Sequence, residues 1–119
     1  MLRFRGAREF VEVGYLEAEI VQVLNLAAAW CARRSKKNKT VVDISSWNDH
    51  KHKKGSLHYE DKAVDLIVRD EQDKLDTAGL KGLARALKQH LPLGYDVVYD
   101  SPGHYRHIHV EWDVRIARA

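Results

Sequence analysis

The segment RHIHVEWDV near the end of the chain alternates between polar and apolar side chains, and this alternation constrains the fold most strongly. Successive side chains of a β-strand point to opposite faces of the sheet. Ile108 and Val110 therefore share a face that can be buried, whereas His107, His109 and Glu111 share the other face. A strand of this kind belongs to a sheet that is covered on one side. The polar row is either a solvated surface or part of a site, and the strand alone does not distinguish the two.

The rest of the pattern predicts two helices and three further strands, in the order helix, strand, strand, helix, strand, strand. The expected helices are 15–34 and 73–90, and the expected strands are 40–44, 63–69, 95–99 and 106–114. Gly79 and Gly82 weaken the second helix locally. A turn that contains Pro102 and Gly103 joins the last two strands and favours an antiparallel hairpin. We therefore expect an α+β fold, a small antiparallel sheet with two main helices packed on one face.

Length and composition fit one globular domain. The chain has 119 residues, of which 45% are hydrophobic and 31% charged, so we expect residues 1–119 to form a single domain. One cysteine, Cys31, excludes an intramolecular disulfide and a zinc site built from thiolates. No apolar run approaches the ~20 residues of a membrane span. The N-terminal segment lacks the apolar core of a signal peptide, so neither a leader nor a membrane partner is expected.

Histidine is the informative residue type, because six of the seven histidines fall in two short stretches. The first holds His50, His52 and His58, and the second holds His104, His107 and His109. With cysteine scarce, this distribution indicates a metal site of nitrogen and carboxylate ligands.

Two carboxylates lie inside apolar strands and need partners. Asp65 interrupts the run AVDLIV, where burial of an unpaired carboxylate costs several kcal/mol, so a cation, backbone amides or a metal must face it. Asp43, in TVVDI, is interpreted as an edge or structural residue. His58 precedes Asp65 by seven residues, so both reach one metal only if the chain bends near 60–62. Two imidazoles and one carboxylate would leave the fourth zinc position open for water.

The stretch SLHYEDKAVD, followed later by His107-Ile108-His109, resembles the zinc signature shared by D-Ala-D-Ala metallopeptidases and hedgehog signalling domains. That pattern is Ser-x-His, six residues, Asp, and a late His-x-His, and the likeness covers residues 39–112. The resemblance implies one Zn²⁺ bound by His58, Asp65 and His109. It also implies that His107 is a non-ligand that stabilises an oxyanion.

The resemblance assigns further residues to the site. His52 is in register with another site histidine of the hedgehog domain. We expect Trp47, which lies before the motif, and Ser56, which is its first residue, to contact the substrate. The family's general base is an acidic residue shortly before the last histidine. In this sequence the acid of that turn is Asp100, and Glu111 is the alternative base.

The sequence also departs from the family. No arginine lies between residues 40 and 56 to hold a substrate carboxylate, so the clamp is absent or is supplied by a lysine of the segment KHKK, residues 51–54. The acidic calcium-binding residues of hedgehog domains are not reproduced around Trp47, so calcium is not expected. Charge runs such as 33–39 and 51–54 are usually solvated, and nucleic acid is not expected as a partner.

The resemblance implies a zinc-dependent peptidase of bacterial or phage type. Its expected substrates are peptidoglycan stem peptides, cut as by a D,D-carboxypeptidase or endopeptidase. Such a protein would be cytoplasmic or delivered by a phage. The alternative is a catalytically silent zinc module that binds a partner protein or a carboxylate ligand. Two departures allow it, since the missing arginine leaves no clamp and Asp100 matches the family's base only across a gap in a longer turn. The sequence does not define an oligomeric state.

Overall fold

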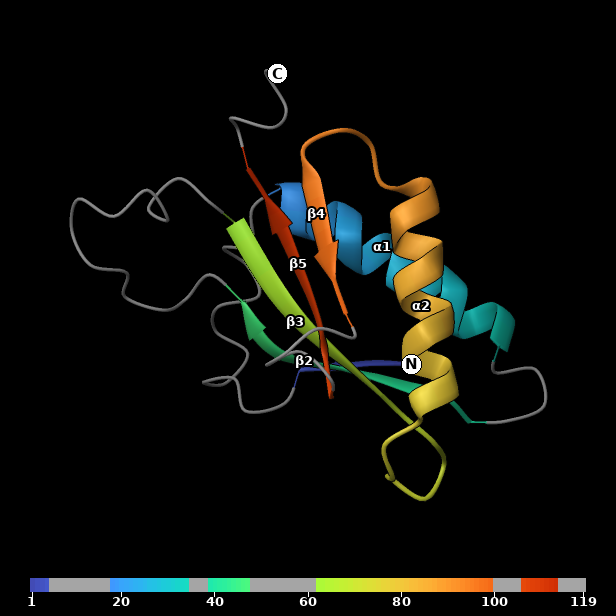
Figure 1. The fold of residues 1–119 in the computed structure, drawn as a ribbon. Coiled ribbons are helices and arrows are strands. Elements are labelled where there is room, and N and C mark those ends of the chain that lie inside the picture. The colour runs from blue at the N-terminus through green and yellow to red at the C-terminus, as the bar shows by residue number, and fades with distance from the viewer. Residues whose placement is uncertain (5–17, 35–38, 48–61, 100–105, 114–119) are drawn as a thin grey trace.

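Seven elements of secondary structure are present in the computed structural model, which describes residues 1–4, 18–34, 39–47, 62–99 and 106–113 (Figure 1). They are β1 (Leu2–Phe4), α1 (Ala18–Arg34), β2 (Val41–Trp47), β3 (Lys62–Arg69), α2 (Thr77–His90), β4 (Tyr95–Val98) and β5 (Ile108–Trp112). The six expected elements are all among them, and their ends differ from the expected ends by a few residues. The strand β1 was not predicted. The α+β class is therefore confirmed.

The strands form one sheet in the order β1-β2-β3-β5-β4. The pairs β2–β3, β3–β5 and β5–β4 are antiparallel, whereas β1 lies parallel to β2. The expectation of a purely antiparallel sheet is therefore wrong, and the sheet is mixed. Parallel neighbouring strands require a long crossover segment between them. The chain between β1 and β2 contains α1 and is long enough to provide this crossover.

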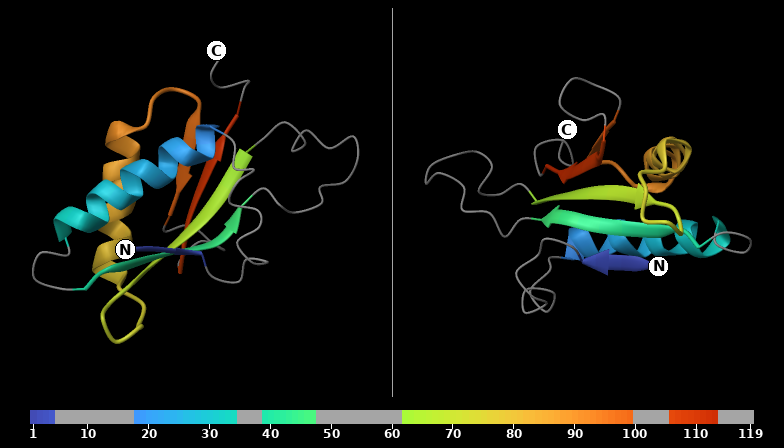
Figure 2. Two further views of the ribbon diagram at one scale, coloured as in Figure 1. Left: turned by 180° about the vertical axis from the view of Figure 1, so that it is seen from behind. Right: turned by 90° about the horizontal axis from the view of Figure 1, so that it is seen from below.

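One face of the sheet carries the apolar core. The helices α1 and α2 lie against this face (Figures 1 and 2). Alternate residues of the three central strands are buried there and pack against apolar side chains of both helices. The fully buried strand residues are Val42, Ile44, Val64, Leu66, Val68, Ile108 and Val110, and the fully buried helix residues include Val23, Ala27, Leu80, Leu83 and Leu87. No helix in the described part of the chain is long and apolar enough to cross a membrane.

Gly79, which weakens the helical pattern in the sequence, has a packing role at the start of α2. Asp76 caps the helix, because its carboxylate accepts a hydrogen bond from the backbone N–H of Gly79 at 2.8 Å. A Cβ on Gly79 would lie 2.6 Å from both Asp76 Oδ2 and Val68 Cγ1. The absence of a side chain at Gly79 therefore lets α2 approach β3 closely. The helix begins at Thr77, after this cap, and not at residue 73 as expected.

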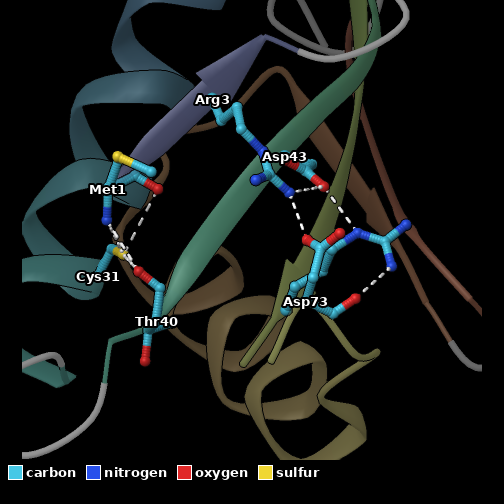
Figure 3. A network of polar contacts seen from close by, with 7 residues as sticks. Met1, Arg3, Cys31, Thr40, Asp43 and Asp73 are labelled. Atoms are coloured by element: carbon cyan, nitrogen blue, oxygen red, sulfur yellow. Dashed lines mark hydrogen bonds and ion pairs between the residues drawn. The ribbon is translucent and has the colours of Figure 1, made fainter. Parts of the chain in front are cut away.

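The opposite face of the sheet carries polar side chains, and part of it is an ion-pair network around the buried Asp43 (Figure 3). Asp43 is fully buried and accepts hydrogen bonds from Arg3 Nε at 2.6 Å, from Arg3 Nη2 at 3.0 Å and from Arg69 Nε at 2.7 Å. Arg3 Nη2 also donates to Asp73 at 2.7 Å. Since β2 is an interior strand, Asp43 is not an edge residue, and its ion pairs tie β1, β2 and β3 together.

Candidate functional site

Asp65 and His109 meet on this polar face because β3 and β5 are neighbours in the sheet. The two residues lie opposite each other in the antiparallel register, and directly opposed side chains project to the same face. His109 Nδ1 lies 2.8 Å from Asp65 Oδ1, although the residues are 44 positions apart in the chain. The partner that the sequence predicts for Asp65 is therefore an imidazole of the late histidine pair, and the Asp65 side chain itself is only partly buried.

Two further ionisable side chains lie close to this contact, one on His107 directly before β5 and one on Glu111 of β5. His107 Nε2 lies 4.0 Å from Asp65 Oδ1, and Glu111 Oε1 lies 3.7 Å from His109 Nε2. The side chains of His107, Asp65, His109 and Glu111 are 28%, 27%, 28% and 24% exposed. We call these four residues the acid–imidazole cluster. Asp65, His109 and Glu111 are held by strand backbone, His107 directly precedes β5, and all four are still reachable from solvent, as a binding or catalytic site requires.

The cluster perturbs the ionisation of His109. The hydrogen bond to Asp65 raises the pKa of His109 above its usual value, and the charges of Asp65 and Glu111 act in the same direction. Partial burial opposes these effects and lowers the pKa. In the absence of a metal, Asp65 therefore favours a proton on Nδ1, which donates the shared hydrogen bond.

Several of the expected site residues lie outside the described residues. These are His52, Ser56, His58 and Asp100. Trp47 is the last residue of β2, and it pairs with Val64 of β3. Residues 48–61, which include His52, Ser56 and His58, lie in the sequence between Trp47 of β2 and Lys62 of β3, and Lys62 is three residues before Asp65. Within the described ranges, no group of three or more His, Cys, Asp and Glu residues is arranged to hold a metal ion.

The carboxylate of Glu111 lies close to the His109 ring, a contact that was not predicted from the sequence. The sequence placed Glu111 on the same face and considered it only as an alternative base. In the structure its carboxylate faces the ring nitrogen of His109 that points away from Asp65. The i, i+2 spacing on one strand could have indicated this contact, because such residues are successive neighbours on one face.

Comparisons with protein-family models, with curated proteins and with solved structures found no match. The functional assignment therefore depends on the geometry of the cluster together with the zinc-signature resemblance.

Proposed function

We propose that the protein is a zinc-dependent hydrolase that cleaves peptide bonds of peptidoglycan stem peptides. The contact of Asp65 with His109 at 2.8 Å is the observation that carries this proposal. The motif assigns these two residues, with His58, as the three protein ligands of one Zn²⁺. The pairing of β3 with β5 supports that assignment, because it unites the two halves of the motif independently of their sequence spacing.

The two atoms that face each other have the chemistry and nearly the separation that zinc needs. Carboxylate oxygen and imidazole nitrogen bind zinc at roughly 2.0–2.2 Å, so two such ligands of a tetrahedral ion lie about 3.3 Å apart. Asp65 Oδ1 and His109 Nδ1 are 2.8 Å apart, which is hydrogen-bonding distance. The ion would fit if these two atoms moved apart by about half an ångström and the proton that they share were lost. The third ligand, His58, is four residues before the first residue of β3.

The same geometry favours Glu111 as a positioning residue. If Nδ1 of His109 binds the metal, its Nε2–H is left to face Glu111 Oε1, at 3.7 Å. Metal-bound histidines commonly donate their second N–H to a carboxylate, which fixes the ring and raises the basicity of the ligating nitrogen. We therefore assign Glu111 to the orientation of His109 and retain Asp100 as the general base.

Zinc, when bound, would supply a water molecule of lowered pKa and would polarise the scissile carbonyl. Asp100 would take up a proton from the attacking water and pass it to the leaving amine. His107 would donate a hydrogen bond to the oxyanion that develops on the substrate. His52 would assist at the same centre, and Ser56 and Trp47 would contact the peptide. Such an enzyme belongs in a bacterium or a phage, acting in the cytoplasm or delivered to the wall by the phage.

A second candidate is the silent zinc module, and one observation favours it. Arg3 and Arg69 lie on the same face of the sheet as the cluster and could have held a substrate carboxylate, but both are bound to Asp43. Neither of these two arginines is therefore available in place of the clamp that the 40–56 segment lacks. A module that binds a partner protein or a carboxylate ligand would need zinc but no turnover.

An amine-release assay separates the two candidates. The zinc-loaded protein is incubated with muropeptides and with D-Ala-D-Ala, and free amine is measured over time. We expect turnover by the wild type, and a loss on the order of a hundredfold in His107→Ala with zinc retained, the scale of losing one oxyanion donor. His90→Ala, an exposed histidine at the end of α2, is the matched control and should keep the wild-type rate. Release of no amine by a zinc-loaded protein across this panel would contradict the hydrolase and favour the module.

A further inference from the structure

A row of cations runs along the exposed side of α2. Lys81, Arg85 and Lys88 follow one another at helical spacing, so their side chains share one face, and all three are exposed. The row is about 10 Å long, given the 1.5 Å rise per residue of a helix. α2 contains no Asp or Glu, and none of the three cations forms an ion pair with an acidic side chain of the described residues. Among the residues that the structure describes, no acidic side chain therefore pairs with the positive charge of the row.

The row borders an open groove of about 510 Å³. We call it the α2 groove, and its lining residues are Lys81, Ala84, Arg85, Lys88, Gln89 and Tyr99. α2 packs on the apolar face of the sheet, whereas the acid–imidazole cluster is on the opposite face. The groove is thus separate from the candidate active site, and a ligand bound in it would leave that site accessible.

We propose that the α2 groove binds a linear phosphodiester polymer, namely an anionic polyol-phosphate polymer of the bacterial cell wall. Successive phosphates of an extended chain can follow the row, and the guanidinium of Arg85 can hold one phosphate through two parallel N–H bonds. Gln89 adds an amide donor at the same wall. Polyanion binding follows from the groove alone, whereas the choice of a wall polymer rests on the proposed function, since such binding would keep a hydrolase close to its stem peptides.

The lining argues against two other anionic partners. Helices that insert into a membrane surface present large apolar side chains beside their cations. The exposed large hydrophobic residues of the described chain are Met1, Val21, Leu75 and Leu93, and none of them belongs to α2. Proteins that bind single-stranded nucleic acid stack bases on exposed aromatic rings. The aromatic residue that lines the groove, Tyr99, is partly buried against the core.

A binding titration with matched charge variants tests the proposal. The full chain is titrated with a fluorescent glycerol-phosphate oligomer, and a triple variant, Lys81→Gln, Arg85→Gln and Lys88→Gln, is compared with the wild type. The control triple variant, Arg33→Gln, Lys39→Gln and Lys74→Gln, removes the same charge from exposed positions elsewhere. Each cation near an anionic chain contributes about fivefold in affinity, so the α2 variant should bind on the order of a hundredfold more weakly. The slope of log Kd against log salt should be about 2 for the wild type.

Each outcome of the titration decides one point. The proposal is supported if the control triple variant binds like the wild type and only the α2 variant fails, with circular dichroism showing that both are folded. It is overturned if the oligomer does not bind, or if both variants lose affinity equally, since net charge alone then explains binding. Tighter binding of single-stranded DNA with the same variant dependence would replace the wall polymer with nucleic acid. Because the titration needs neither zinc nor turnover, its failure is distinguishable from failure of the proposed hydrolase.

Discussion

Replacement of Asp43 by asparagine should destabilise the fold strongly, because it removes the negative charge on which two arginines converge. Asp43 is fully buried, and its three hydrogen bonds to Arg3 and Arg69 are 2.6–3.0 Å long. Loss of one partner of a buried ion pair costs about 3–5 kcal/mol. The side chains of Arg3 and Arg69 are 33% and 24% exposed, so water can solvate them in part. We therefore expect a loss of about 2–3 kcal/mol in the free energy of unfolding.

Equilibrium unfolding in urea, followed by circular dichroism, measures this loss. Asp73→Asn is the matched control, because Asp73 also accepts a hydrogen bond from Arg3, at 2.7 Å, but its side chain is 48% exposed. Exposed ion pairs contribute about 1 kcal/mol or less. Asparagine also tolerates the positive φ of 65° at this position, so the backbone is not strained by the change. An Asp43→Asn variant that loses no more stability than Asp73→Asn would refute the reasoning.

Three further predictions concern the site, the packing of α2 and the response to pH. Asp100→Asn should abolish turnover with zinc retained, whereas Glu111→Gln should mainly weaken zinc binding, by roughly 10- to 100-fold in a metal titration. If only Glu111→Gln abolishes turnover, the base is on β5. Gly79→Ala should lower the free energy of unfolding by about 1–3 kcal/mol, because the new methyl group overpacks the contact of α2 with β3, and a neutral effect in a urea titration would contradict that packing. Asp65 raises the pKa of His109. In the metal-free protein, the hydrogen bond between these two residues therefore stabilises the folded state below pH 6.5, and this stabilisation is lost as the pH rises through the raised pKa of His109 in the folded state. Unfolding curves measured at pH values below and above the raised pKa should show this loss in the free energy of unfolding, and His109→Gln should not show it.

Much of the fold follows from periodicity in the sequence. The alternation of β5 predicted which residues face the core, and Ile108 and Val110 are both fully buried. The strand β1 could not be predicted in this way, because three residues, LRF, are too few to show a period. Its strand conformation depends on pairing with β2 and on the ion pair of Arg3 with Asp43, which join positions 40 residues apart. Such contacts are visible only in three dimensions.

The candidate site was likewise predictable only in part. The sequence predicted that Asp65 needs a partner and that His107, His109 and Glu111 share a face. It could not identify that partner from spacing, because the contact of Asp65 with His109 depends on which strands are neighbours and on their register. The row of cations on α2 was missed for another reason. The i, i+4, i+7 spacing of Lys81, Arg85 and Lys88 was visible, but only the structure shows the groove beside it.

The zinc content of the wild type and of two matched variants tests the central claim most directly. Each protein is stripped of metal, titrated with zinc and analysed for bound metal after dialysis. Asp65→Asn and Asp43→Asn make the same chemical change on the same face of the sheet, and only Asp65 belongs to the acid–imidazole cluster. We expect one tightly bound zinc ion per chain in the wild type and in folded Asp43→Asn, and a collapse of zinc affinity in Asp65→Asn. A wild-type chain that takes up no zinc, or an Asp65→Asn variant that binds it as tightly as the wild type, would contradict the account.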